Sequence, residues 1–506
     1  MTLGRTLAVA LVGLRGHVVE VEAHLAPSLP AFTLVGLPDA ALAESRDRVR
    51  AAVSSSGLAW PQRRITVNLS PATLPKSGST FDLAIAVAML AGAEAVEPAR
   101  ADGIVHLGEL GLDGRLRPVR GVLPAVAAAV AAGHPRVVVP RGNLAEACLV
   151  PGARAVGADS LAEVAAGYGA DVDVPDVVPV AADHAATAAR PDLDLADVVG
   201  QEDARLSLEV AAAGGHHLLM VGPPGTGKTM LAARLPGLLP DLSELDAVEV
   251  TAVHSVAGTF DPGDGLLRRP PFEDPHHTAT PASVVGGGSG VPRPGAASRA
   301  HRGVLFLDEA PEFTTAVLQT LRQPLEHGEL VLHRAAGAAR YPARFQLVLA
   351  ANPCPCGKAV GKGLGCTCRS EQRRRYFGKL SGPLLDRVDL QVELGPARPG
   401  GTPGERSAVV ASRVATCREA QAQRLAGTPW RTNADVPGAW LRARLGADRS
   451  LTAELDRAVD RGTLSLRGMD RVLRVAWTLA DLGGRDAPGR ADVGQALLLR
   501  TRGHGA

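Results

Sequence analysis

A glycine-rich loop followed by a lysine and a threonine is the strongest chemical signal in the sequence. The stretch LLMVGPPGTGKTML matches G-x-x-x-x-G-K-[ST], with an apolar run before it and a helical run after it, which is the context that a phosphate-binding loop needs. Backbone N–H groups of such a loop face phosphate oxygens at a helix N-terminus. We expect Lys228 to contact the β- and γ-phosphates of ATP and Thr229 to bind Mg²⁺. The residues predicted to bind the nucleotide are Gly222, Pro223, Pro224, Gly225, Thr226, Gly227, Lys228 and Thr229.

Two adjacent acids end a second apolar run, GVLFLDEAPEF. A carboxylate at the tip of a neighbouring parallel strand can hold Mg²⁺, and the next acid can polarise the attacking water as a general base. We assign these roles to Asp308 and Glu309, respectively. The pair alone is a weak signal, since such pairs also occur on surface helices. Together with the upstream loop it predicts ATP hydrolysis.

A polar residue also ends the apolar run FQLVLAAN, which we interpret as a third buried strand. In P-loop ATPases of the AAA+ kind a residue at this place orients the water, so Asn352 is assigned that role. The segment LSGPLLDRVDL then offers Arg387, which is suited to reach the γ-phosphate of a neighbouring subunit as an arginine finger. The alternative is a surface arginine paired with Asp386 or Asp389.

Three arginines lie on roughly one face of a predicted helix near the C-terminus, SLRGMDRVLRVAWTLADL. They are Arg467, Arg471 and Arg474. We expect one of them, Arg467, to touch the nucleotide from a lid. The alternative is a solvated basic face.

Four of the six cysteines fall within fifteen residues, as C-x-C-x9-C-x-C. Four thiolates at about 2.3 Å from a tetrahedral Zn²⁺ would close this loop into a knuckle, and they would leave no open position for catalysis. A disulfide pair, free buried cysteines and an iron–sulfur cluster are the alternatives. The predicted zinc ligands are Cys354, Cys356, Cys366 and Cys368.

Two adjacent histidine pairs, His216-His217 and His276-His277, offer a competing metal site. Neighbouring residues do not share a helix face, so a joint site is disfavoured. We expect structural or nucleotide-sensing roles for them.

The composition is that of a globular protein of several domains. Of the 506 residues, 46% are hydrophobic and 21% are charged. The net charge of +2 does not by itself indicate a nucleic-acid partner. No apolar run of eighteen residues or more occurs, so no membrane span is expected. The N-terminus favours a strand pair over an export signal, and a cytoplasmic, reducing location is expected.

Changes in pattern divide the chain into predicted domains. Residues 1–170 alternate short Val/Leu/Ile runs with Ala-rich helical stretches, which favours an α/β domain. Residues 171–194 are acidic and contain proline, which is typical of a linker. Residues 195–394 hold the ATP motifs, and residues 395–506 begin with a Gly/Pro joint and are helical by pattern.

These motifs together resemble the magnesium-chelatase-like AAA+ family and, within it, the ComM/YifB branch. The resemblance covers essentially the whole chain. It implies an α/β fold in three parts: an N-terminal Lon-protease-like domain of the ribosomal S5 kind, a central AAA+ P-loop ATPase domain, and a C-terminal helical lid of the magnesium-chelatase type. The segments that carry it are GHHLLMVGPPGTGKTMLAARLPGLLP, PFEDPHHTATPASVVGGG, HRGVLFLDEAPEF, LVLAANPCPCG, LSGPLLDRVDL and RVLRVAWTLADL.

The N-terminal part resembles a protease domain but departs from its catalytic pattern. Lon uses a Ser–Lys dyad, and here the nucleophile position falls at Thr80 while the lysine position falls near Leu123. A hydroxyl without an adjacent amine or imidazole is a poor nucleophile. The nearby amine, Lys76, belongs to the loop frame. We therefore expect a Lon-like fold without proteolysis, with a role in assembly or substrate contact.

A motor with a trans-acting arginine implies a ring, usually a hexamer. The resemblance to ComM implies DNA as the substrate, with ATP-driven branch migration in homologous recombination and natural transformation. Basic clusters suit phosphate contacts that do not read sequence, although solvated surface or subunit salt bridges are the alternative. These residues are Arg268, Arg269, Arg293, Arg299, Arg302, Arg373, Arg374, Arg375 and Lys379.

Two other classes of function stay open at this stage. A metal-chelatase motor subunit is disfavoured by the Lon-like domain and the cysteine cluster. A non-enzymatic scaffold, or a chaperone-like remodeller of a protein partner, is disfavoured because the catalytic acids Asp308 and Glu309 are both present.

Overall fold

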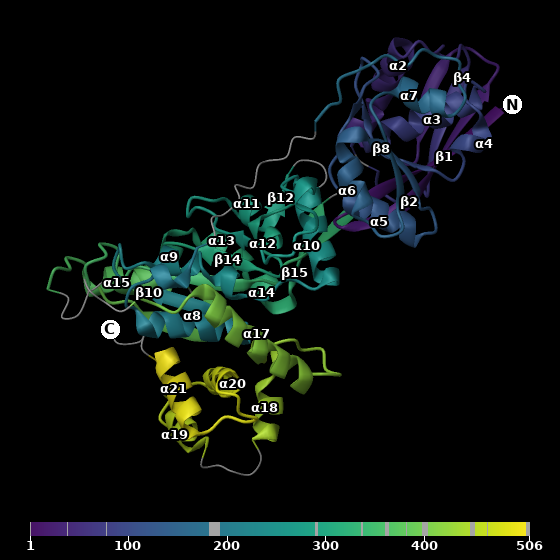
Figure 1. The fold of residues 1–506 in the computed structure, drawn as a ribbon. Coiled ribbons are helices and arrows are strands. Elements are labelled where there is room, and N and C mark those ends of the chain that lie inside the picture. Colours follow the sequence, from purple (N-terminus) through teal and green to yellow (C-terminus); the bar gives the residue numbers. More distant parts are fainter. Residues whose placement is uncertain are drawn as a thin grey trace.

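The protein has an N-terminal domain, a central α/β domain and a C-terminal helical bundle, arranged along an elongated molecule (Figure 1). The predicted α/β class with a helical C-terminal part is confirmed. No helix in the described part of the chain is long and apolar enough to cross a membrane. The computed structural model describes residues 2–501 except 38, 77, 182–192, 289–291, 335–336, 360–363, 381, 397–402, 446–450 and 463.

A seven-stranded mixed sheet forms the N-terminal domain, in the order β3-β4-β2-β1-β5-β8-β9. The predicted N-terminal strand pair is present, since β1 and β2 pair antiparallel from Thr2 opposite Leu25 to Val12 opposite Arg15. The strands of this sheet are β1 (Thr2–Val12), β2 (Arg15–Ala26), β3 (Ala31–Val35), β4 (Arg64–Ser70), β5 (Val105–His106), β8 (Arg136–Pro140) and β9 (Arg154–Ala158), and β6 (Glu109–Leu110) pairs with β7 (Leu116–Arg117) apart from it.

Helix α3 (Asp82–Gly92) is buried along its whole length. Its sequence DLAIAVAMLAG is apolar on every face, which is the pattern of an enclosed helix. Small residues let it approach β1 closely, since a Cβ on Gly4 would lie 2.1 Å from the carbonyl oxygen of Ala88. The other helices of the domain are α1 (Ala40–Ala43), α2 (Ser45–Ser55), α4 (Pro98–Ala101), α5 (Val122–Ala131), α6 (Leu144–Cys148) and α7 (Leu161–Gly167).

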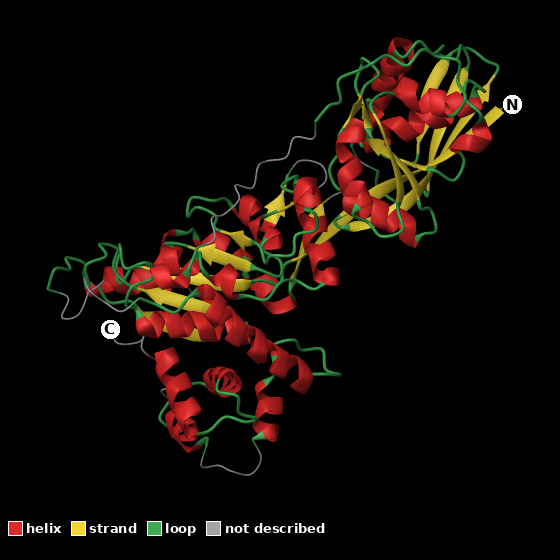
Figure 2. Ribbon diagram, in the orientation of Figure 1, coloured by secondary structure: helices red, strands yellow, loops and turns green. Residues whose placement is uncertain are grey.

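The central domain is built on a five-stranded sheet in the order β11-β14-β17-β10-β18, with parallel pairing throughout. Strand β17 reads QLVLAA and is buried at every position, because helices cover both faces of the sheet (Figure 2). Parallel pairing brings the carboxyl ends of β10, β14 and β17 to one edge. The strands are β10 (Leu218–Val221), β11 (Phe272–Glu273), β14 (Val304–Leu307), β17 (Gln346–Ala351) and β18 (Leu390–Glu393).

Two short antiparallel ribbons extend this domain. They are β12 (Gly286–Gly287) with β13 (Arg293–Pro294), and β15 (Glu329–Arg334) with β16 (Gly337–Pro342). The helices of the domain are α8 (Glu202–Gly214), α9 (Lys228–Ala232), α10 (Glu244–Ala257), α11 (Pro281–Val285), α12 (Ala296–Arg299), α13 (Thr315–Thr320), α14 (Arg322–His327), α15 (Ser370–Gly378) and α16 (Gly382–Leu385).

The C-terminal bundle shares a core with the central domain. Leu208 of α8, Val414 of α17 and Leu473 of α20 belong to one buried apolar cluster. The bundle consists of α17 (Ser407–Arg424), α18 (Gly438–Arg444), α19 (Ala453–Asp460), α20 (Leu466–Leu482) and α21 (Arg490–Thr501).

The N-terminal domain is seated directly on the central domain. Ala252 of α10 lies in the apolar cluster of Val122 and Val126 on α5, and Glu146 of α6 hydrogen-bonds to Ser255 of α10. At the β1–β2 turn, a Cβ on Gly13 would lie 2.4 Å from the carbonyl oxygen of a residue on β16. Within the predicted linker, residues 171–181 form no helix or strand, and 182–192 lie outside the described residues.

Candidate functional site

The glycine-rich loop joins strand β10 to helix α9. Gly225 and Gly227 adopt φ values of +79° and +90°, a conformation that side chains disfavour, and this lets the loop curl back on itself. The Lys228 ammonium donates hydrogen bonds to the carbonyl oxygens of Gly222, at 2.6 Å, and Pro223, at 3.0 Å. Burial lowers the pKa of Lys228, and the charges of Asp308 and Glu309 oppose this shift. The lysine is therefore held inside the loop, at the place where phosphates would enter.

Residues from three neighbouring strand ends meet at this loop. Lys228 donates to Oδ1 of Asn352 at 3.1 Å, and the Thr229 hydroxyl donates to Oδ2 of Asp308 at 2.6 Å. Hydroxyl and carboxylate oxygens are ligands that Mg²⁺ prefers. Thr229 and Asp308 thus fit a magnesium ion, and the structure brings together four residues that the sequence singled out.

Glu309 follows β14 and has a partner that the sequence did not reveal. Its φ of +50° turns the chain at this point, its side chain is 47% exposed, and its Oε2 lies 3.2 Å from Nδ1 of His277. His277 follows β11, which is the next strand in the sheet. The contact between His277 and Glu309 could not be predicted from the sequence, because it depends on the pairing of β11 with β14 and the two residues lie far apart along the chain.

Arg387 forms an ion pair with Glu326 of α14, and its side chain is 24% exposed. The sequence-based alternative was a partner in Asp386 or Asp389. Asp389 instead binds His216 and Arg471. The role of Arg387 toward a neighbouring subunit stays a prediction.

The three lid arginines of α20 have different surroundings. Arg471 donates to Asp389 at 3.1 Å, and Arg474 donates to the carbonyl oxygen of Val436 at 2.7 Å. Arg467 lies in the first turn of α20, is exposed, and has no hydrogen bond or ion pair within the described residues. Arg471 therefore ties the helical bundle to the central domain, Arg474 holds two parts of the bundle together, and a nucleotide contact by Arg467 stays a prediction.

The histidine pair before the loop has a structural role. His216 is buried, with Nδ1 at 3.2 Å from Asp389 and Nε2 at 2.8 Å from the Thr478 hydroxyl of the lid. Burial alone would raise the pKa of Asp389, but the hydrogen bond with His216 and the nearby arginines hold it well below its usual range. Burial lowers the pKa of His217 to about 4, and its Nδ1 accepts the Leu347 backbone N–H at 2.9 Å.

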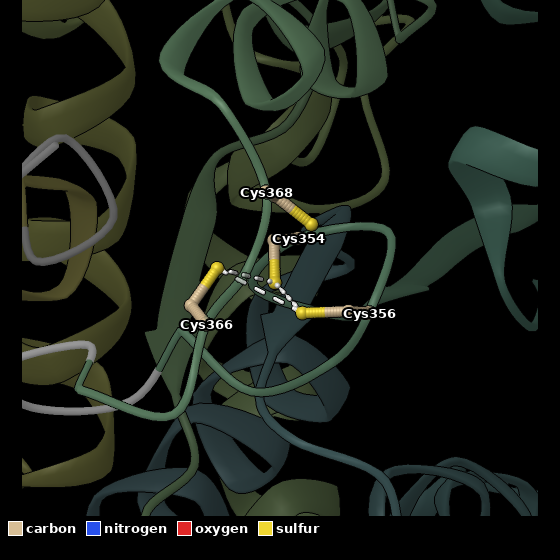
Figure 3. A group of neighbouring side chains, drawn as sticks. All are labelled: Cys354, Cys356, Cys366 and Cys368. Atoms are coloured by element: carbon tan, nitrogen blue, oxygen red, sulfur yellow. Dashed lines mark hydrogen bonds between the residues drawn. The ribbon is translucent and has the colours of Figure 1, made fainter.

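The four clustered cysteines converge just beyond the end of β17, where their sulfur atoms point toward one another (Figure 3). All four sulfurs lie within 4.8 Å of each other. Three of the separations are 3.3, 3.6 and 3.7 Å, close to the about 3.8 Å between thiolates around a tetrahedral zinc ion. Each cysteine is free, so the disulfide alternative is not present. The donor set and spacing fit Zn²⁺.

The residues at the positions of the Lon dyad form no nucleophile–base pair within the described part of the chain. Lys76 is buried and donates to the carbonyl oxygen of Pro71, and burial lowers its pKa. Leu123 is buried in α5. Within the described residues no amine or imidazole hydrogen-bonds to the Thr80 hydroxyl.

Several of the basic residues singled out by the sequence have acidic partners within the chain. Arg299 binds Glu273 at 2.7 Å, Arg302 binds Asp246 at 3.1 Å, and Arg375 binds Glu371 at 3.0 Å. These three arginines thus form ion pairs within the chain, and a contact of any of them with DNA or with another subunit stays a prediction. Arg268, Arg293 and Arg374 are exposed.

Comparison with known proteins agrees with this architecture. Residues 194–400 match the family described as "Magnesium chelatase, subunit ChlI", residues 21–143 match "Subunit ChlI of Mg-chelatase", and residues 404–500 match "Magnesium chelatase, subunit ChlI C-terminal". A phosphate loop and strand-end acids on a parallel sheet, followed by a helical lid, define a P-loop ATPase of the AAA+ class.

Full-length relatives narrow the assignment. A Mycobacterium tuberculosis protein is 54% identical over 512 residues, covering 99% of both chains. The Escherichia coli protein YifB is 41% identical over 502 residues, covering 97% of this chain and 96% of its own. Competence protein ComM of Haemophilus influenzae is 39% identical over 506 residues, covering 99% and 98%. The chain belongs to the ComM/YifB family of magnesium-chelatase-like AAA+ ATPases.

Proposed function

We propose that this protein is an ATP-driven ring motor that acts on DNA and carries out branch migration during recombination, including recombination of incoming DNA in natural transformation. The observation that carries the proposal is the meeting of Lys228, Thr229, Asp308 and Asn352 at one sheet edge, in a chain that is 39% identical over nearly its full length to Competence protein ComM.

Each residue at the sheet edge has a proposed task. Lys228 binds the β- and γ-phosphates, and Thr229 and Asp308 hold Mg²⁺, which neutralises phosphate charge when bound. Glu309 accepts a proton from the attacking water, and Asn352 orients that water. The half-exposed position of Glu309 supports this role, because water can reach it.

Assembly supplies the remaining residues. Arg387 is partly exposed and forms an ion pair with Glu326, and in a hexameric ring the γ-phosphate of a neighbouring subunit would replace this glutamate as its partner. Arg467 reaches the nucleotide from the lid. Exposed Arg268, Arg293 and Arg374 contact DNA phosphates without reading sequence. We place this motor in the cytoplasm.

The domains have separate proposed roles. Residues 1–170 form a Lon-like domain without protease activity, used for assembly or substrate contact, and residues 171–194 link it to the AAA+ core of residues 195–394. Residues 395–506 form the lid. The cysteine cluster holds a structural Zn²⁺, supported by its sulfur geometry.

Steady-state ATPase rates with a panel of DNA structures test the proposal. Four-way and forked DNA should stimulate turnover strongly, and the stimulation should fall as salt rises, because phosphate contacts release counterions. A rate that ignores all DNA but rises with a porphyrin-chelatase partner would instead favour a metal-chelatase-type motor. A rise with an unfolded protein alone would favour a remodeller of protein partners. Casein cleavage that is lost in Thr80→Ala would contradict an inert N-terminal domain.

A further inference from the structure

The cysteine cluster lies against the phosphate-binding loop. Gly357 follows Cys356, has a φ of +72°, and approaches the loop so closely that a Cβ there would lie 2.7 Å from Cδ of Pro224. Any side chain at this position would be both conformationally strained and in collision with a proline ring. The contact is thus built into the backbone of both loops.

A shared pocket lies where the two loops meet. Its volume is about 500 Å³, within the range of small-ligand sites. The phosphate-binding loop contributes Pro224 and Thr226, and the cysteine loop contributes Cys356 and Lys358. One zinc ligand and Lys358 therefore share a pocket with residues of the phosphate-binding loop.

Lys358 brings a positive charge to the pocket between the two loops. Its side chain is exposed, and within the described residues its ammonium has no hydrogen bond or ion pair. Zinc with four thiolates carries two net negative charges, so such a cluster beside a phosphate site needs a nearby cation. The Lys358 backbone N–H also hydrogen-bonds to the Cys356 sulfur, which ties the position of the lysine to the cluster.

We propose that zinc bound by the four cysteines fixes the segment Cys356–Lys358 against the phosphate-binding loop, and that Lys358 thereby contacts a phosphate of the nucleotide as a positioning residue. This inference rests on the proposed nucleotide site and deepens it. Zinc occupancy then sets nucleotide affinity. The consequence reaches ATP binding itself, before any DNA or ring assembly is involved.

The test measures zinc content and the Kd of a fluorescent ADP analogue on the full-length protein without DNA. Cys366→Ser with Cys368→Ser removes two ligands that do not line the pocket. This variant should lose its zinc and bind the nucleotide about tenfold more weakly, because the wall segment must be ordered on binding. Lys358→Ala should keep its zinc and bind about fivefold more weakly, the size expected for an exposed charge pair.

Matched variants separate these effects from general damage. Cys148→Ser changes an exposed cysteine of the N-terminal domain, and Lys379→Ala changes a lysine that does not line the pocket. Both should keep zinc and affinity. Chelation of the parent protein should reproduce the affinity loss, and added zinc should restore it, which covers the case in which the double cysteine variant fails to fold.

Some results would overturn the inference while leaving the proposed function intact. One is a zinc-free parent protein with unchanged nucleotide Kd; another is a Lys358→Ala protein that binds like Lys379→Ala. Full zinc content in the double cysteine variant would remove the metal site itself. Lys228→Ala should lose nucleotide binding in every case, and an unchanged Kd for that variant would refute the nucleotide site and the proposed function with it.

Discussion

Replacing Glu146 with alanine should loosen the N-terminal domain from the central domain. The Glu146 carboxylate accepts the backbone N–H of Leu123 at 2.9 Å and the hydroxyl of Ser255 at 2.5 Å, and both hydrogen bonds are buried. The amide of Asn143 approaches it at 3.3 Å. One carboxylate thus joins α5 and α6 of the N-terminal domain to α10 of the central domain.

The size of the effect follows from what each change leaves unpaired. A hydrogen bond to a charged group contributes about 1.5–3 kcal/mol, and a buried donor without a partner costs a similar amount. Glu146→Ala strands the Leu123 N–H and the Ser255 hydroxyl, so we expect a loss of about 3–5 kcal/mol. Ser255→Ala removes one donor and should cost about 1.5–2 kcal/mol. Because the two side chains touch, the double variant should fall short of the sum by about 1–2 kcal/mol.

Hydrogen exchange read by mass spectrometry is the suitable assay, since a chain of several domains does not unfold in one step. Peptides from α5 and α10 should exchange at least about tenfold faster in Glu146→Ala, each factor of ten being about 1.4 kcal/mol. Glu163→Ala, on the outer face of α7 where Glu163 binds Arg141, should leave α10 unchanged. Strict additivity of Glu146→Ala and Ser255→Ala in α10 would refute the reasoning.

Three further predictions concern catalysis and pH. Glu309→Gln should retain nucleotide binding but lower ATP turnover by about a hundredfold, as expected for loss of a general base; an unchanged kcat would contradict the assignment. His277→Ala should lower kcat by about tenfold with little change in KM, because Nδ1 of His277 lies 3.2 Å from Glu309 and positions it; equal changes in kcat and KM, or none, would count against this. Burial lowers the pKa of His106 to about 3. Below about pH 6.5 this histidine therefore takes up a proton in the unfolded chain but not in the folded chain. Its contribution to stability falls as the pH is lowered, by about 2 kcal/mol between pH 7 and 5. Hydrogen exchange of peptides from β1 and β5, with rates referred to the unfolded chain at each pH, should show about 2 kcal/mol less of this loss in His106→Gln than in the parent.

The residues around the phosphate loop could be predicted because the position of a residue at the end of a buried parallel strand can be inferred from the sequence alone. An apolar run that ends in a polar residue places that residue at a sheet edge, and parallel strands share that edge. Asp308 and Asn352 follow this logic, and the structure brings both to Lys228 and Thr229. The spacing of the cysteines likewise predicted that their sulfurs would converge.

The partners that came from tertiary packing could not be predicted. His277 reaches Glu309 only because β11 pairs with β14 over two residues, too few to leave a periodic signal. The arginines of α20 are equivalent by helical spacing. In the structure, however, Arg471 donates to Asp389, which directly precedes β18, whereas Arg467 is exposed. Which member of a helical face meets an acid depends on the crossing of distant elements, and periodicity carries no such information.

The seat of the N-terminal domain on α10 makes it a lever. The domain extends away from the central domain, with β4 near its far end (Figure 1), and it is fixed at its base by the apolar cluster around Ala252 and by Glu146. A rigid arm multiplies rotation by its length, so a small tilt of α10 moves the far strands through a longer arc. A longer segment at residues 171–194 would not change the length of this arm. Weaker contacts around Ala252 and Glu146 would instead uncouple the movement of the N-terminal domain from that of α10.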